Sequence, residues 1–291
     1  MQKNKFNNFL HLHFIVFIWG FTAVLGKLIS IDAIPLVWYR LSIAAVLLFF
    51  VLIYNKTSLK LNAKSFSQFL FGGIIIGLHW ITFFYAIKIT NVSITLAALS
   101  TGAFFTSFLE PLILKKKLET YEIILSLLTV IGIIIIFNVE PSYAIGISVA
   151  LLSAFLSSLF TVTNAIFVTQ NSAKLITFYE LLFAALFISV IILFNDGFSI
   201  DFFTLSQTDW IYIFILGSIC TAYALTASAW LLKKISPFSM MLTINLEPVY
   251  GIILALLVFG SSEKMTTHFY YGAILIFSTV ILNGYLKNKK I

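Results

Sequence analysis

Charged residues are scarce in this sequence: 10% of its 291 residues are Asp, Glu, Lys or Arg, whereas 60% are hydrophobic. A water-soluble chain of this length needs a charged, wettable surface, and this composition does not supply one. The mean hydropathy of +1.05 agrees. The shortage of charge therefore predicts an integral membrane protein.

Cysteine is nearly absent, and several catalytic motifs are missing. The single cysteine, Cys220, lies in an apolar stretch, which excludes a disulfide within the chain and a thiolate metal site. His11 and His13 have no acidic or thiol residues beside them, so we expect no metal site there. The sequence also lacks G-x-x-x-x-G-K-[ST], H-E-x-x-H and G-x-S-x-G. We expect neither an enzyme nor a cofactor.

Long apolar stretches make up most of the chain, and each is near the ~20 residues that a helix needs to cross a bilayer. We predict an all-α integral membrane protein with ten transmembrane helices. The expected spans are about 9–30, 35–54, 66–87, 92–113, 121–138, 145–168, 175–194, 209–232, 238–259 and 268–286.

The cations gather in the connections on one side of these spans. If the N-terminus is cytoplasmic, 14 lysines fall inside, against Lys88 and Lys264 outside. An excess of Lys and Arg marks cytoplasmic loops, so both termini are expected in the cytoplasm. The net charge of +7 is then explained by topology, and no nucleic-acid partner is expected. We expect a multi-pass protein of a bacterial inner (plasma) membrane.

The chain reads as two copies of one unit. Ala86–Ser93 is similar to Leu232–Ser239, 146 residues later. The two halves are predicted at 1–140 and 141–291, with five spans each. An odd number of crossings forces the second copy to insert upside down, which gives an inverted repeat. Such repeats are typical of transporters, in which two halves of opposite orientation open alternately to either side.

Three features together resemble a known family: the segment Trp19–Lys27, the triplet Tyr39-Arg40-Leu41, and the duplicated ends of spans 92–113 and 238–259. The chain resembles the EamA-type exporters of the drug/metabolite transporter superfamily from about residue 14 to 286. It departs where Lys115–Lys117 replaces the acidic residue usual after the fourth span, while the second copy keeps Glu263. Span 145–168 also has Ser157-Ser158 where the first span has Trp19-Gly20.

The resemblance implies a secondary transporter in the plasma membrane that exports small metabolites, amino acids or related compounds, by alternating access. Its partners would be the lipid bilayer, a small-molecule substrate and possible coupling protons. Two alternatives stay open: proton-coupled efflux of lipophilic cations, and a membrane scaffold that transports nothing.

Glu247 lies about halfway along an apolar span and is followed by Pro248. A carboxylate at that depth is costly unless it is protonated, paired or facing water, so intramembrane acids usually mark function. Pro248 removes a backbone hydrogen bond and is expected to kink the helix there. Glu247 is the first candidate for proton coupling and Glu180 the second, although either could instead hold neighbouring helices together.

Aromatic and small hydroxyl side chains recur on the predicted helices. Such a mixture suits a cavity for amphipathic metabolites, but the same residue types also mediate helix contacts and mark membrane interfaces. The residues predicted to line the substrate pathway are Trp19, Thr22, Arg40, His79, Phe83, Ser100, Asn164, Tyr179, Tyr223, Trp230, Thr243 and Glu247.

Span 66–87 contains Gly73 and Gly77 in the G-x-x-x-G spacing that allows helices to pack closely. His79 follows near the middle of the span. Two roles for His79 stay open. One is functional, either substrate binding or proton exchange, and the other is that of a hydrogen-bonded structural residue.

The remaining charges are expected near the ends of spans. Lys27 and Arg40 are placed in the outer third, where long side chains can reach the interface and where Asp32 is available as a partner. We predict a structural role for Lys27, whereas Arg40 could also attract a substrate carboxylate. Glu110 is predicted to form an ion pair with the lysines at 115–117.

Overall fold

A computed structural model describes residues 2–117, 120–139, 141–195 and 197–289, and all regular structure in these ranges is helical. The α-helices are α1 (Gln2–Leu28), α2 (Ala33–Tyr54), α3 (Ala63–Ile89), α4 (Val92–Leu99), α5 (Gly102–Leu114), α6 (Thr120–Val139), α7 (Ala144–Phe167), α8 (Ala173–Phe194), α9 (Gln207–Gly217), α10 (Ala224–Leu231), α11 (Pro237–Ile244), α12 (Glu247–Phe259) and α13 (Thr267–Lys289). Four short elements connect them: η1 (Pro141–Tyr143), η2 (Asp201–Phe203), the π-helical η3 (Ser218–Tyr223) and η4 (Gly260–Glu263).

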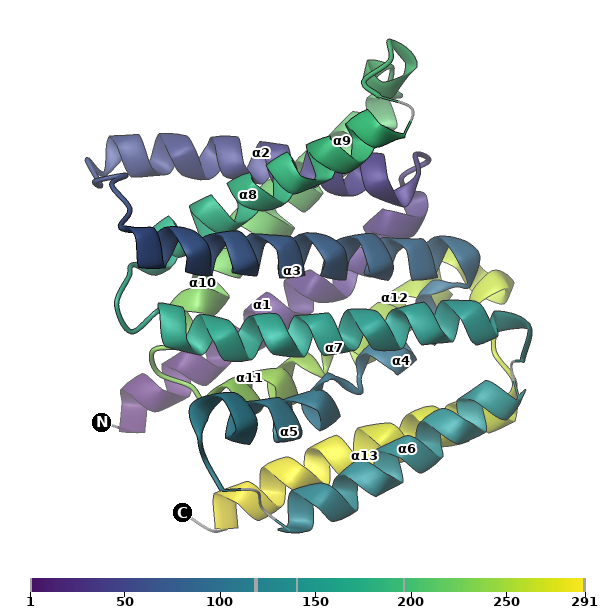
Figure 1. The fold of residues 1–291 in the computed structure, drawn as a ribbon. Helices are drawn as coiled ribbons and strands as arrows, with labels where there is room; N and C mark the ends of the chain where they lie inside the picture. Colours follow the sequence, from purple (N-terminus) through teal and green to yellow (C-terminus); the bar gives the residue numbers. More distant parts are fainter. Residues whose placement is uncertain (1, 118–119, 140, 196, 290–291) are drawn as a thin grey trace.

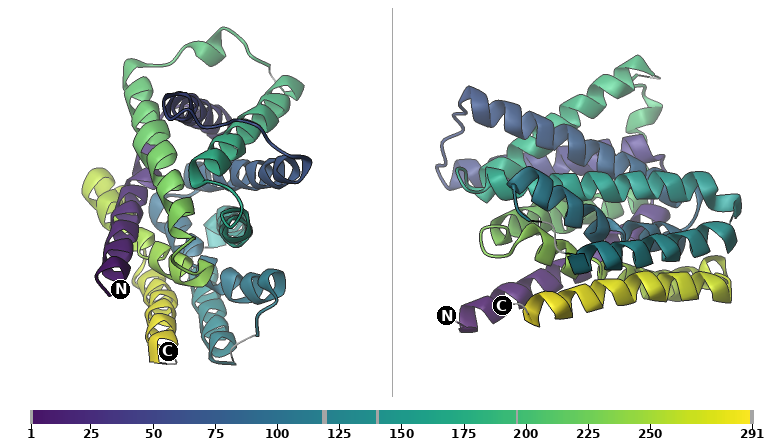
Figure 2. Two further views of the ribbon diagram at one scale, coloured as in Figure 1. Left: turned by 90° about the vertical axis from the view of Figure 1, so that its left-hand side faces the viewer. Right: turned by 60° about the horizontal axis from the view of Figure 1, so that its bottom comes forward.

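Within the described ranges, eight helical segments are long and apolar enough to cross a membrane. They coincide with eight of the ten expected spans. The other two expected spans fall on α6 and α13, helices of 20 and 23 residues that pack against each other at one edge of the bundle (Figures 1 and 2). The apolar stretch found in α6, Leu127–Ile136, is shorter than a full span.

The helices lie roughly along one direction, and both termini lie at the same end of the bundle (Figure 1). We call this the terminal end. It also holds the connections that follow α2, α5, α7 and α10. The opposite end, called the far end, holds the connections that follow α1, α3, α8 and η4.

Two of the expected spans are broken. Span 92–113 divides into α4 and α5 at Ser100–Thr101, and span 238–259 divides into α11 and α12 at Asn245–Leu246, 145 residues later. In the first break the hydroxyls of Ser100 and Thr101 donate to the carbonyls of Ala97 (2.6 Å) and Ala98 (2.7 Å), which competes with helix continuation. The sequence did not indicate this break.

The second break lies beside Glu247, where the sequence predicts a kink. At the predicted kink the helix ends at Ile244, and Glu247 and Pro248 begin α12 after a two-residue turn. Proline is well suited to the first turn of a helix, where its missing N–H has no intrahelical partner to lose. Glu247 therefore lies at a helix N-terminus near the middle of a span, where the helix dipole favours a carboxylate.

The span expected at 209–232 contains the π-helical turn η3 between α9 and α10. The hydroxyl of Thr221 donates to the carbonyl of Leu216, five residues earlier, at 2.6 Å. A π turn shifts the helix face by the extra residue it contains. The side chains after η3 therefore face directions that a regular helix would not give them.

Gly73 lets α3 approach α8 closely, as the G-x-x-x-G spacing predicts. A Cβ atom at Gly73 would lie 2.6 Å from the carbonyl oxygen of Glu180 and 2.9 Å from Cβ of Phe183, whereas one at Gly77 would lie 3.5 Å from Cβ of Ala184. Gly73→Ala must push backbone away and is expected to destabilise the protein by about 1–3 kcal/mol. Thermal unfolding in detergent measures the loss.

Gly77→Ala is the matched control, because its added methyl makes ordinary van der Waals contact. It is expected to unfold within a degree or two of the unmodified protein. Equal unfolding temperatures for the two variants would contradict the close approach at Gly73.

Candidate functional site

A cavity of about 80 Å³ lies where the broken spans meet α1, α2, α3, α7 and α10. This volume holds several water molecules. Seven of the twelve predicted pathway residues line it: Trp19, Thr22, Arg40, His79, Phe83, Asn164 and Glu247. The rest of the wall consists of Ile76, Trp80, Leu99, Ser157, Phe160, Thr161, Leu225, Ser228, Ala229, Leu232, Met240, Met241 and Ile244.

Arg40 is buried in the wall of this cavity with 1% of its surface exposed, and it does not extend to the membrane interface as one reading of the sequence suggested. Its guanidinium carbon lies 4.0 Å from the ring centroid of Trp80. Its Nε donates to Thr221 Oγ1 at 2.5 Å, and Nη2 donates to the carbonyl of Cys220 at 3.4 Å. Nη1 has no hydrogen-bond partner among the described residues. Nη1 is thus a hydrogen-bond donor without a partner, whereas Nε and Nη2 of the same guanidinium are held by η3.

Glu247 lines the same cavity and is 7% exposed. It is the first residue of α12, whose dipole favours a carboxylate at this end. One acid and one guanidinium therefore line the same small, mostly apolar cavity. Intramembrane charges are tolerated when they face one another or a cavity that admits water.

His79 is held by α7. Its Nδ1 lies 2.9 Å from both the carbonyl oxygen and the hydroxyl of Ser153, and its ring stacks on Phe83 at a centroid distance of 6.1 Å. The imidazole also lines the cavity. The structural and the functional readings of His79 are thus compatible, because one edge of the ring is anchored while the residue contributes to the wall.

Glu180, the second candidate for proton coupling, is fully buried outside the cavity wall. Its Oε1 accepts a hydrogen bond from Asn164 Nδ2 at 2.9 Å, and Asn164 itself lines the cavity. Any Cβ at Gly72 would overlap this carboxyl, so a glycine on α3 makes room for the acid. Glu180 is therefore connected to the cavity wall by its hydrogen bond with Asn164.

Three predicted pathway residues, Ser100, Thr243 and Tyr179, lie outside the wall, and their hydroxyls donate to backbone carbonyls. Ser100 donates to Ala97, and Thr243 donates to the carbonyl of Ser239 at 3.0 Å, each within its own helix. The Tyr179 hydroxyl donates to the carbonyl of Leu59 at 2.5 Å, in the connection after α2.

Tyr223 and Trp230 also lie outside the cavity. They are 44% and 43% exposed and line a second, lateral groove. The cavity instead receives Leu225 and Ser228 from this helix. Tyr223, Thr226 and Trp230 share one face, as their spacing predicts, but this face borders the groove and not the cavity.

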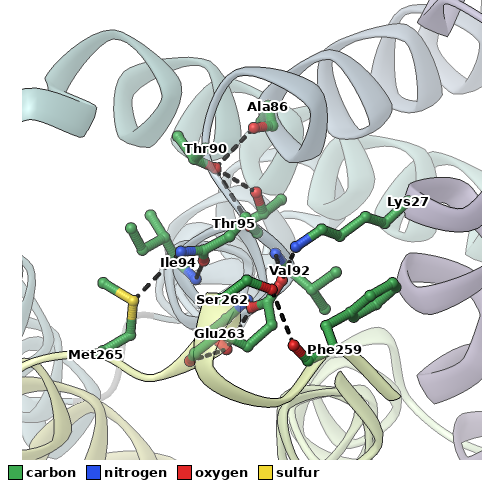
Figure 3. A network of polar contacts seen from close by, with 12 residues as sticks. Lys27, Ala86, Thr90, Val92, Ile94, Thr95, Phe259, Ser262, Glu263 and Met265 are labelled. Atoms are coloured by element: carbon green, nitrogen blue, oxygen red, sulfur yellow. Dashed lines mark hydrogen bonds and ion pairs between the residues drawn. The ribbon is translucent and has the colours of Figure 1, made fainter. Parts of the chain in front are cut away.

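Glu263 lies at the centre of a polar network at the far end of the bundle (Figure 3). Its carboxylate accepts hydrogen bonds from the backbone N–H groups of Val92 (3.1 Å) and Ser93 (2.9 Å) and from the Ser93 hydroxyl (2.8 Å). Lys27 completes the group with an ion pair of 2.6 Å. Lys27 was expected near Asp32, but η4 carries Glu263 onto the first turn of α4, within reach of α1. We call Lys27, Glu263 and the start of α4 the far-end clasp.

Glu110 makes the corresponding contact at the terminal end. It accepts a hydrogen bond from the backbone N–H of Phe238 at 2.8 Å, at the start of α11, and forms an ion pair of 2.6 Å with Lys116. The predicted pairing of Glu110 with the lysine run is confirmed. We call Lys116, Glu110 and the start of α11 the terminal-end clasp. Each half of the chain thus caps the broken span of the other half with a carboxylate, as helix N-termini favour.

Comparison with known proteins agrees with this architecture. The family model described as "EamA-like transporter family" matches residues 10–138 and 144–285. No curated protein sequence matches the chain significantly. Among the 28 matching chains of solved structures, a crystal structure aligns with a TM-score of 0.70 over 96% of both chains at 13% identity, which shows a shared fold. The resemblance drawn from the sequence is confirmed, because two consecutive matches cover nearly the whole chain: the protein belongs to the EamA-like transporter family of the drug/metabolite transporter superfamily.

Proposed function

We propose that the protein is a secondary transporter that exports zwitterionic metabolites, amino acids or related compounds. The observation that carries the proposal is the pairing of Arg40 and Glu247 in one cavity. The unpartnered Nη1 of Arg40 would receive the substrate carboxylate, and Glu247 would receive the ammonium group. Trp19, Trp80 and the neighbouring apolar wall would cover the substrate side chain.

The proposed architecture is ten transmembrane helices in two inverted repeats, 1–140 and 141–291, with α6 and α13 as the fifth and tenth spans. The two broken spans support inversion, because α4 begins at the far end whereas α11 begins at the terminal end (Figure 1). Broken helices that meet at the membrane midplane are where such carriers hold substrate.

The exposed lysines support the orientation. Each connection at the terminal end carries a cation within it or in the first turn of the next helix, which favours cytoplasmic termini in a plasma membrane. The exposed terminal-end lysines are Lys56, Lys60, Lys64, Lys115, Lys116, Lys117, Lys174, Lys233 and Lys234.

Alternating access would use the two clasps. Opening the far-end clasp would connect the cavity to the outside, and opening the terminal-end clasp would connect it to the cytoplasm. The arrangement described above has both clasps made, with the binding residues between them. Protons would couple through Glu247, with Glu180 behind Asn164 as the second group.

Efflux of lipophilic cations is the weaker proposal, because Arg40 would repel a cation at the cavity. Glu247 and the aromatic wall would suit such a substrate, but Glu247 shares the space with a guanidinium. Membership of a transporter family argues against a scaffold that transports nothing.

Flux measurements in proteoliposomes test the proposal, using labelled amino acids and lipophilic cations with and without a pH gradient. We expect the protein to transport the zwitterionic amino acids, the pH gradient to stimulate this flux, and the lipophilic cations not to be transported. Glu247→Gln is expected to lower gradient-stimulated flux at least about tenfold, equivalent to about 1.4 kcal/mol.

Asp201→Asn is the matched control, because it makes the same change of charge at an exposed position in η2. It should leave flux unchanged. Full flux with full gradient dependence in Glu247→Gln would reject Glu247 as the coupling group. Movement of the cations alone would reject the zwitterion substrate.

A further inference from the structure

A second cavity lies on the flank of the bundle, away from the substrate site. It is an open groove of about 610 Å³ at the terminal end, bordered by α2, the start of α8, and η3 with α10. Among the described residues, its wall shares no member with the central cavity.

The long wall of the groove is apolar. Leu47, Leu48 and Val51 form one side, and small residues on the η3–α10 side, among them Ala222 and Ala227, leave room opposite them. The shape and chemistry suit a hydrocarbon chain. Such a chain would fill the space beside the small side chains and bury the apolar surface of the groove.

Trp230 and Tyr223 stand at the rim with nearly half of their surface exposed. The Tyr223 hydroxyl lies 2.9 Å from His11 Nε2, which positions the ring. Exposed Trp and Tyr side chains of membrane proteins are enriched at the level of the lipid headgroups. The rim therefore marks the depth at which a headgroup would sit.

The end of the groove nearest the termini is positively charged. Lys174 and Lys233 both line it and are exposed, and across the described residues neither forms an ion pair. Ser172 and Ala173, at the start of α8, lie beside them in the wall. Helix N-termini favour anions, so this end of the groove combines two ammonium groups with a helix start of the same sign.

The geometry points to a binding site for one anionic glycerophospholipid. Its phosphate binds Lys174, Lys233 and the start of α8, and one acyl chain lies along α2 and α10 beneath Trp230. The charge at one end and the apolar wall along the rest match the two parts of this molecule, whereas a soluble metabolite would use only the first.

The site also borders the substrate cavity through η3. Ala222 and Tyr223 face the lipid groove, while Cys220 and Thr221 of the same turn accept the hydrogen bonds of Arg40. A lipid that packs against η3 therefore supports the turn that holds the guanidinium. The inference stands independently of the substrate, because it concerns binding and stability.

The test uses the purified full chain in detergent, with phosphatidylglycerol, phosphatidylcholine or inorganic phosphate added. We expect phosphatidylglycerol to raise the unfolding temperature by about 5 °C, and the other two to have little effect. Native mass spectrometry should show one retained phosphatidylglycerol. Lys174→Gln with Lys233→Gln should weaken its retention at least tenfold, and Ala227→Phe should abolish it by filling the groove.

The matched control is Lys64→Gln with Lys234→Gln, which removes two exposed cations at the same end but outside the groove. It should keep the lipid. Equal losses in the two double variants would overturn the site in favour of general surface attraction. Equal shifts with phosphatidylcholine, a shift with inorganic phosphate alone, or retention by Ala227→Phe would each overturn it as well.

Discussion

Arg40→Gln is expected to lower the flux of amino acids at least about 30-fold, because it removes one partner of the proposed charge pair with the substrate carboxylate, and losing one partner of such a buried pair costs about 2 kcal/mol or more. The substrate carboxylate would lose its charged donor, and Glu247 would stay in the cavity without a nearby cation. Arg40→Lys should recover part of the flux. It keeps the charge but loses the planar fork that bonds Thr221 and stacks on Trp80.

Initial rates in proteoliposomes measure this effect, with each variant normalised to folded protein. Lys60→Gln, at an exposed position in the connection after α2, is the control for loss of a positive charge. The amine analogue of a transported amino acid, which lacks the carboxylate, should be carried poorly by the unmodified protein and no worse by Arg40→Gln. Wild-type amino-acid flux in Arg40→Gln would remove Arg40 from the proposed binding role.

The helices could be predicted because membrane spanning depends on local composition. A stretch of about 20 apolar residues between charged connections is sufficient evidence in each case. Predicting the breaks in the helices needed more than local composition. Pro248 indicated a disturbance in one span, but the break at Ser100 depends on hydroxyl groups that leave other helices in this chain continuous, such as Thr82 in α3. Composition alone does not distinguish the two outcomes.

The site was predictable where a polar side chain was too costly to face lipid. That argument identified Glu247, which lines the cavity. The mixture of aromatic and small polar side chains was a weaker guide: it placed Asn164 correctly but not Trp230, since an exposed tryptophan and a cavity tryptophan look alike in a sequence. It also missed Trp80, whose contact with Arg40 depends on how α2 and α3 pack.

Long-range partners were the least predictable part. Lys27 and Glu263 are 236 residues apart, so Asp32 was the nearer choice along the chain. The repeat offered an unused signal. If each half inserts its broken span into the other, then an acid near the end of one broken span lies close to the start of the other. Glu110 and Glu263 both satisfy that condition.

The two clasps differ in strength, which predicts a directional effect of breaking them. Glu263 is fully buried and accepts hydrogen bonds from Val92 and Ser93 in addition to the ion pair with Lys27. In Glu263→Gln an amide NH₂ faces these donors. Breaking a buried pair costs about 3 kcal/mol or more, enough to shift a two-state equilibrium about 150-fold. The Lys116 side chain is 52% exposed, so water screens its ion pair with Glu110. Breaking the terminal-end clasp is therefore expected to shift the equilibrium less.

Cysteine labelling from either side of the membrane measures the shift. In a Cys220→Ser background, Ser228→Cys places a thiol on the cavity wall. Glu263→Gln should raise its labelling by an impermeant maleimide strongly from the far-end side, and Glu110→Gln should raise it modestly from the terminal-end side. Lys264→Gln, an exposed change next to Glu263, should do neither. Equal labelling from both sides in Glu263→Gln would mean local unfolding, because a clasp that controls one entrance can expose the cavity only to that side.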